Sequence, residues 1–178
     1  MNLSRQELLL NPTQMDKIKN ANILLIGVGG VGGAVAHMLV RAGIQNLTIM
    51  DFDKVSDSNI NRQFVAYQST IGKYKVDVLT EQLKSINPNI NLTALNQKFD
   101  STNNIDLTGY TMIIDCIDDV KAKQYLISKM FAPVVCLKKP APLSLFVLAL
   151  IEIFLNVAYS PVYNNAPIKV PVKFAFTT

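Results

Sequence analysis

The stretch Ile-Leu-Leu-Ile-Gly-Val-Gly-Gly-Val-Gly-Gly at residues 23–33 predicts a strand, a tight turn and the start of a helix. Four apolar residues in a row, 23–26, are typical of a strand buried on both faces. Gly27, Gly29 and Gly32 then follow the G-x-G-x-x-G spacing, which lets the chain turn sharply, approach a phosphate and pack a helix closely on the strand. Gly30 lies inside the same turn, where a helix N-terminus offers N–H groups to an anion. The stretch predicts a nucleotide site, and a glycine turn kept only for packing is the alternative.

An acidic residue at the end of the next predicted strand favours the nucleotide interpretation. The helix after the glycines carries an apolar stripe over residues 31–42 and is followed by Gly43, which is typical of a helix C-cap. The apolar run 47–50 then ends at Asp51, about 20 residues after the glycines. From that position a carboxylate holds a ribose hydroxyl in dinucleotide-binding folds.

The rest of the chain alternates strands and helices. After a short apolar arm at 3–10, the pattern predicts one helical turn at 15–19 and helices at 75–86 and 120–130. It also predicts strands at 46–50, 91–95 and 110–115. This alternation is typical of an α/β protein with a Rossmann-like, doubly wound and mainly parallel sheet.

A polar stretch, 51–63, follows the second predicted strand, at the edge where open α/β sheets bind ligands. Asp51 and Asp53 supply acceptors for ribose or a metal, and Asn59 supplies an amide. Arg62 supplies a guanidinium that can form a bidentate contact with phosphate. An ordinary polar connection between strand and helix is the alternative.

Charged residues near two further helices suggest phosphate and magnesium. Lys73 and Lys75 stand at the start of the helix 75–86, where cations oppose the helix dipole unless they meet an anion such as a triphosphate. Asp118 follows the strand 110–115 and offers the carboxylate oxygen that Mg²⁺ prefers when it bridges phosphates. The alternative is that Asp118 or Asp119 only caps the following helix.

Composition narrows the class of protein. The chain has 178 residues, 49% of them hydrophobic, as expected for one globular domain. Two cysteines, Cys116 and Cys136, are too few for a disulfide framework or a four-cysteine zinc site, and they fit a reduced cytoplasmic protein without a signal peptide. The net charge of +4 includes no dense Lys/Arg run, so charge alone does not indicate nucleic acid. His37 is the only histidine, and we expect it on a helix surface rather than in a metal cluster or a catalytic triad.

Seven segments together resemble the ubiquitin-activating-type adenylyltransferases, the ThiF/MoeB/HesA superfamily. The segments are 4–6, 27–33, 51–53, 58–63, 71–75, 86–88 and 115–118, and they keep the family's order and spacing over about residues 4–127. An NAD-dependent Rossmann protein has no reason to combine Asn-Arg-Gln at 61–63, Gly-Lys-Tyr-Lys at 72–75 and Asp-Cys-Ile-Asp at 115–118.

The resemblance implies chemistry with ATP and Mg²⁺, in which a substrate carboxylate attacks the α-phosphate and pyrophosphate leaves. It places Gly29 in the nucleotide loop, Asp51 on the ribose and Asp118 on Mg²⁺. It places Asn59, Arg62, Gln63 and Lys75 at or beside the phosphates. It also implies a homodimer in which Arg5 reaches the neighbour's triphosphate.

Within the superfamily, the chain looks most like the tRNA threonylcarbamoyladenosine dehydratase branch. The resemblance implies a tRNA partner whose threonylcarbamoyladenosine carboxylate is adenylated and then cyclised. Adenylation of a ubiquitin-like sulfur-carrier protein is one alternative, and a truncated, non-catalytic nucleotide-binding module is another.

The end of the chain departs from the family pattern, so we expect an ATP-binding domain at 1–130 and an atypical tail at 131–178. The tail contains six of the eight prolines and no glycine. Its apolar run 143–159 is short for a membrane span and includes Glu152 and Asn156, so we do not expect a membrane partner. A buried helix or strand pair, a membrane-associated segment and a truncated or frameshifted sequence are the interpretations left open.

Overall fold

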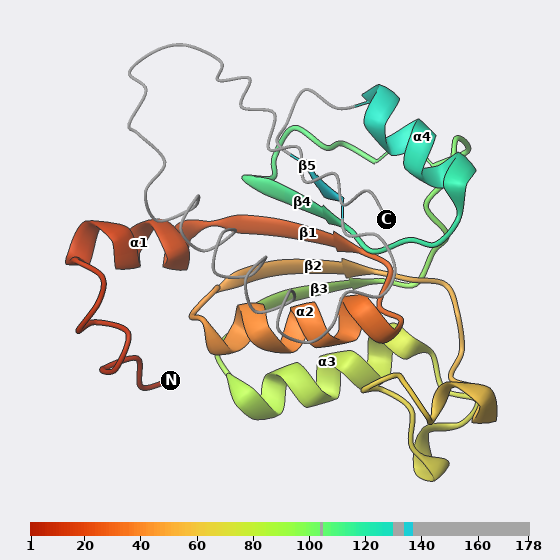
Figure 1. Cartoon of the computed structure of the whole chain (residues 1–178), viewed down its shortest axis with the longest axis horizontal. Helices are drawn as coiled ribbons and strands as arrows, with labels where there is room; N and C mark the ends of the chain where they lie inside the picture. The colour runs from red at the N-terminus through yellow and green to blue at the C-terminus, as the bar shows by residue number, and fades with distance from the viewer. Residues whose placement is uncertain (104, 130–133, 137–178) are drawn as a thin grey trace, which may run out of the picture.

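A parallel sheet forms the centre of the molecule (Figure 1). The computed structural model describes residues 1–103, 105–129 and 134–136. Within them the strands are β1 (Asn22–Ile26), β2 (Asn46–Met50), β3 (Asn91–Leu95), β4 (Met112–Asp115) and β5 (Val134–Cys136). Their order in the sheet is β3-β2-β1-β4-β5, and every pairing is parallel. The predicted Rossmann-like α/β fold is therefore confirmed.

Helices cover both faces of the sheet, as a doubly wound fold requires. Figure 1 shows α2 (Gly30–Arg41) and α3 (Lys75–Ile86) on one face and α4 (Val120–Lys129) on the other. The first helix, α1 (Pro12–Asn20), packs its apolar residues into the same core as α2 and α3. The connection from β2 to α3 contains two short 3₁₀ turns, η1 (Asp57–Asn59) and η2 (Gln68–Thr70).

The strands divide their side chains between two cores, as expected where both faces of a sheet are covered. Along β1, Ile23 and Leu25 join the core beneath α2 and α3, whereas Leu24 and Ile26 join the core beneath α4. All four side chains are at most 2% exposed. The unbroken apolar run at 23–26 was thus a correct sign of burial on both faces.

Asparagines begin three adjacent strands at the same level of the sheet. Asn22 pairs in register with Asn46, and Asn46 pairs with Asn91. The amide of Asn91 donates to the side-chain oxygen of Asn46 over 3.1 Å. The amides of Asn22 and Asn46 donate to the carbonyls of Gly109 and Lys19. This row of asparagines fixes the amino end of the sheet.

The C-terminal end of α2 is closed by the chain itself. Gly43 has φ +99°, and the N–H groups of Gly43 and Ile44 donate to the carbonyls of Val40 and Leu39, which forms a Schellman motif. The N-terminal arm lies against this end, since the amide of Gln6 donates to the carbonyl of Ala42 over 2.9 Å. Leu3 fills the space beside Gly43.

Two predicted boundaries differ from the structure by more than one residue. The first helix begins at Pro12 rather than at residue 15, because Asn11 caps it in a capping box with Gln14 and proline suits the first helical position. Strand β4 begins at Met112 rather than at residue 110. The Thr111 hydroxyl accepts from the N–H of Asn22, so a side chain replaces a ladder hydrogen bond there.

The sheet continues past residue 130. Strand β5 pairs with β4 and belongs to the stretch 131–178 that the sequence set apart. The apolar run 143–159 lies outside the described residues, as does the Cys136 side chain, so the predictions for them stay predictions. Among the helices that are described, none combines the length and the apolar character that crossing a bilayer requires.

Candidate functional site

The candidate site lies where the sheet reverses its winding direction. From β1 the chain moves outward to β2 and β3, and then crosses to β4 on the other side of β1. The carboxyl ends of these strands are level, because Ile26 pairs with Met50 on one side and Asp115 on the other. In open α/β sheets, ligands bind in the crevice at this switch point.

The glycines that open this crevice are required for different reasons. Gly27 has φ +88°, and a Cβ there would lie 2.7 Å from the carbonyl oxygen of Cys116. A Cβ on Gly32 would overlap the carbonyl oxygen of Gly27, so close helix–strand packing excludes any side chain. A Cβ on Gly30 would meet the carbonyl of Arg62 at 3.1 Å. These three glycines are explained by the protein's own packing.

Gly29 is different, because the protein leaves room beside it. The nearest atom to a Cβ built there is Nε2 of Gln63, at 3.8 Å, which is an ordinary contact distance. The Oε1 atom of Gln63 is buried and has no hydrogen-bond partner among the described residues. Room for a further group beside a helix N-terminus, and an amide oxygen without a partner on the Gln63 side chain that adjoins it, both fit a polar ligand, such as a phosphorylated nucleotide.

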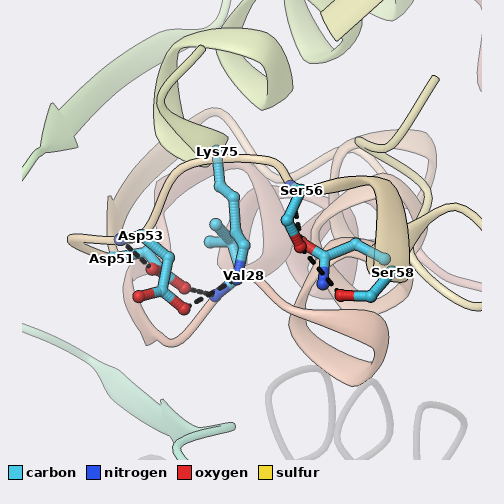
Figure 2. A network of polar contacts seen from close by, with 7 residues as sticks. Val28, Asp51, Asp53, Ser56, Ser58 and Lys75 are labelled. Carbon is cyan, nitrogen blue, oxygen red and sulfur yellow. Dashed lines mark hydrogen bonds and ion pairs between the residues drawn. The ribbon is translucent and has the colours of Figure 1, made fainter. Parts of the chain in front are cut away.

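Asp51 ties the glycine turn to the end of β2. Its carboxylate accepts from the N–H of Val28 and from the N–H of Asp53, each over 2.8 Å (Figure 2). The carboxylate therefore stands at the glycine turn, on the side of the crevice formed by β2. This is the position from which the sequence analysis expected it to hold a ribose.

Lys75 points into the protein and pairs with Asp53 (Figure 2). The Nζ–Oδ2 distance is 2.7 Å, and the Lys75 side chain is only 7% exposed, against 47% for Asp53. The sequence analysis missed this pair, because the two residues are 22 positions apart and no local pattern links them. The pair brings a buried cation from the start of α3 to the edge of the glycine turn.

The loop after β2 organises the next two candidates through its own hydrogen bonds. The Asn59 side-chain oxygen accepts from the N–H of Ser56 over 3.1 Å, and the hydroxyls of Ser56 and Ser58 are 3.0 Å apart (Figure 2). The Arg62 guanidinium is exposed and donates to the Ser58 carbonyl over 2.6 Å and to Asn61 over 3.0 Å. The loop thus buries Asn59 and leaves the Arg62 guanidinium open to solvent.

The loop after β4 divides its roles between two aspartates. Asp119 caps α4 by accepting from the N–H groups of Lys121 and Ala122, and it lies 3.9 Å from the ammonium of Lys98. Asp118 is exposed, and its carboxylate has no recorded hydrogen bond or ion pair within the described part of the chain. The capping alternative applies to Asp119, so the Asp118 carboxylate is open for a cation such as Mg²⁺.

His37 is half-buried, which corrects the expectation of a plain surface position. Its Nε2 atom lies 3.2 Å from the side-chain oxygen of Gln82 on α3, and its ring lies 5.6 Å from that of Phe64. Burial, with a smaller effect from the charge of Arg41, lowers the pKa of His37. The side chain faces α3, which a helical wheel of α2 alone does not show.

A family model identifies the class of protein to which this arrangement belongs. The ThiF family model matches residues 3–140, which is most of the chain. The chain belongs to the ThiF family. The match includes the glycine turn, the loop after β2 and the loop after β4.

Curated relatives of this ThiF-family chain include enzymes with different substrates. The tRNA threonylcarbamoyladenosine dehydratase of Haemophilus influenzae is 40% identical over 122 residues, which are 67% of this chain and 47% of that protein. The molybdopterin-synthase adenylyltransferase of Salmonella typhimurium is 37% identical over 112 residues, which are 62% of this chain and 45% of that protein. The chain thus spans about half the length of the curated relatives that it matches.

Solved structures of ThiF-family relatives show the same fold. The crystal structure of the Escherichia coli tRNA threonylcarbamoyladenosine dehydratase in complex with ATP has a TM-score of 0.72 and 31% identity. The match covers 75% of this chain and 57% of that one. A complex of the same dehydratase with AMP matches with a TM-score of 0.71.

Arg5 lies apart from the other candidate residues of this ThiF-family chain. It is exposed on the arm, between Leu3 and Gln6, both of which contact the C-terminal end of α2. The glycine turn is at the opposite end of this 12-residue helix, about 18 Å away at 1.5 Å per residue. A single chain therefore does not bring Arg5 to its own glycine turn.

Proposed function

We propose that this protein binds ATP with Mg²⁺ and adenylates a substrate carboxylate. The observation that carries the proposal is the room beside Gly29, where the Nε2 atom of Gln63 at 3.8 Å is the nearest atom of the described residues, together with the Oε1 atom of the same amide, which has no partner among them. The complexes of the E. coli dehydratase with ATP and AMP support a nucleotide as the occupant of that space.

In this proposal, the chain's own residues hold the nucleotide from both sides. The N–H groups at the start of α2 face the phosphates, and Asp51 accepts from the ribose. Lys75 and the exposed Arg62 neutralise the charge that builds up as the carboxylate attacks the α-phosphate. Asn59 and Gln63 complete the phosphate side, and Asp53 holds Lys75 in place. Mg²⁺, held by Asp118, supplies further neutralisation of the phosphate oxygens.

We propose threonylcarbamoyladenosine in tRNA as the source of the carboxylate, with cyclising dehydration following adenylation. The support is the similarity to two dehydratases. The H. influenzae enzyme is 40% identical in sequence over the matched residues, and the E. coli structure matches with a TM-score of 0.72. The similarity to molybdopterin-synthase adenylyltransferases supports a second candidate, the C-terminal carboxylate of a ubiquitin-like sulfur-carrier protein.

The position of Arg5 supports a homodimer. Because Arg5 lies at the far end of α2 from its own glycine turn, its proposed contact with a triphosphate has to be made in a second copy of the chain. A dimer of one Arg5→Ala chain and one Arg62→Ala chain has one intact site out of two. Isolated mixed dimers should therefore show about one half of the wild-type activity, and an equal mixture of the two chains about one quarter.

The test is exchange of labelled pyrophosphate into ATP. Exchange stimulated by tRNA that carries threonylcarbamoyladenosine supports the first substrate, and exchange stimulated by a carrier protein supports the second. Arg62→Ala and Asp118→Ala should each reduce exchange by about 10²-fold or more while leaving the circular dichroism spectrum unchanged, because both side chains are exposed. ATP binding without exchange on either substrate would show a non-catalytic nucleotide-binding module.

A further inference from the structure

A buried ion pair lies directly beneath the loop that carries Asp118. Asp115, the last residue of β4, is only 1% exposed, and its Oδ2 atom lies 2.8 Å from the Nζ atom of Lys123 on α4. The Lys123 side chain is 15% exposed. We propose that Asp115 and Lys123 are positioning residues that hold the loop 116–118 so that the Asp118 carboxylate faces the nucleotide phosphates. The inference rests on the proposed function and adds to it two residues that the resemblance did not assign.

The two oxygens of the Asp115 carboxylate bind different groups. While Oδ2 accepts from Lys123, Oδ1 accepts from the N–H of Ile117 over 2.9 Å. The lysine therefore fixes the rotation of the carboxylate, and the carboxylate fixes the peptide between Cys116 and Ile117. Asp118 is the next residue along the chain.

The same peptide is held from its other side by the glycine turn. The preceding peptide is held by β1, because the N–H of Cys116 donates to the carbonyl of Ile26 over 2.8 Å. The carbonyl of Cys116 and the nitrogen of Ile117 both lie within 3.1 Å of the place where a Cβ of Gly27 would be. The peptide is thus clamped between Gly27 and Asp115, and any rotation of Asp115 moves the loop relative to the glycine turn.

Charge compensation in the loop favours a role beyond packing. Three aspartates lie within residues 115–119. Lysines from other elements face two of them, Lys123 at Asp115 and Lys98 at Asp119, at 2.8 and 3.9 Å. A buried ion pair is seldom more stabilising than well-packed apolar side chains of the same size, so stability alone does not explain this one. Among the described residues, Asp118 is thus the one of these three aspartates that no lysine faces.

The experiment compares ATP affinity with saturating Mg²⁺ and with EDTA by titration calorimetry, using the full chain. The ratio of the two affinities measures how well Asp118 meets the metal–phosphate complex. Lys123→Met should lower this ratio at least fivefold and leave AMP affinity within twofold, because Asp51 and the glycine turn stay in place. Lys123→Arg should restore the ratio to within twofold of the wild-type value.

Lys121→Met is the matched control, since Lys121 lies on the same helix but its side chain is exposed. It should leave the ratio unchanged. If Lys123→Met does not fold, the double variant Asp115→Asn/Lys123→Met, which leaves no uncompensated buried charge, should lower the ratio at least threefold. A lower melting temperature with an unchanged ratio in the folded variants would overturn the inference and leave the proposed function standing. A wild-type chain that binds no ATP would overturn both.

Discussion

The two ends of α2 both depend on glycine, but for different reasons. At the C-terminal end, Gly43 adopts φ +99° and the space beside it is filled by Leu3 of the same chain. At the N-terminal end, Gly29 has a negative φ, and no atom of the described residues lies nearer than 3.8 Å to the position of its missing Cβ. Gly43, whose space is filled from within, serves the fold, whereas the room beside Gly29, at a helix N-terminus, is the space that we propose for a ligand.

Substitutions at these glycines should therefore separate stability of the fold from affinity for the nucleotide. Substitutions at positions filled from within should lower the free energy of unfolding. A substitution at the open position should lower nucleotide affinity and leave the fold nearly as stable as before. The predictions below test the separation, and they follow in order of decreasing expected effect.

Gly32→Ala should have the largest effect, because its Cβ would overlap the backbone carbonyl of Gly27, which cannot move without shifting the whole turn. We expect a loss of about 3 kcal/mol or more in the free energy of unfolding, measured by urea denaturation. Nucleotide binding should be lost with it. A stable Gly32→Ala protein that binds ATP normally would refute the packing described for the glycine turn.

Gly43→Ala should cost about 2 kcal/mol in unfolding free energy, because φ +99° is strained for alanine and the Cβ would displace Leu3. Gly72→Ala is the matched control, since Gly72 also has positive φ but no atom of the residues that the structure describes lies within 4 Å of its Cβ position. It should cost less than Gly43→Ala. Equal costs would show that Leu3 contributes nothing, and ATP affinity should stay unchanged in Gly43→Ala.

Gly29→Ala should lower ATP affinity more than it lowers the free energy of unfolding. We expect at least a tenfold loss of ATP affinity, about 1.4 kcal/mol, because the methyl group would occupy the space proposed for a phosphate. Unfolding free energy should fall by no more than about 1 kcal/mol. Calorimetric titration with ATP measures the first quantity. Gly109→Ala, at an exposed glycine without neighbours within 4 Å, provides the control and should change neither quantity.

His37 should give the smallest effect, and one that depends on pH. Its pKa is lower in the folded chain than its usual value of 6.5, so the unfolded chain binds more protons near that pH. The contribution of His37 to the free energy of unfolding is therefore fully present above about pH 6.5, and it is lost as the pH falls below that value. The decline is modest, because the side chain is only partly buried and so keeps part of its contact with solvent. Urea midpoints at pH 5.5 and 7.5 should differ less in His37→Gln than in the wild-type chain, and equal differences would contradict this.

The order of the strands and helices from α1 to α4 was predictable from the sequence, because it depends on local patterns, whereas strand β5 was not predicted. An unbroken apolar run marked β1, helical spacing of apolar residues marked α2 and α3, and the glycine spacing marked the turn between β1 and α2. The predicted starts of α1 and β4 were wrong because side-chain hydrogen bonds, which the apolar pattern does not show, set the first residue of each element. Asn11 and Gln14 started α1 earlier than the apolar pattern did, and Thr111 delayed β4.

The candidate site was predictable as a set of positions but not as a set of contacts. Asp51 and Asp118 follow strands that end at the same edge, so their placement follows from topology. Partners from distant segments left no local pattern. Lys75 meets Asp53 across 22 residues, and Gln6 meets Ala42 across 36. Only the folded structure shows that Arg62 is exposed, while Lys75 is buried and paired with Asp53.

The asparagine row at the amino end of the sheet has a consequence for how the chain folds. Parallel strands pair slowly, because a long loop must lose conformational entropy before the strands can form hydrogen bonds. Asn46 and Asn91 are 45 residues apart. A slip of one residue would place Leu92 beside Asn46 and break the amide contact at the first rung. The row therefore favours the observed register, because a strand shifted by one residue loses this hydrogen bond at its first pair of residues.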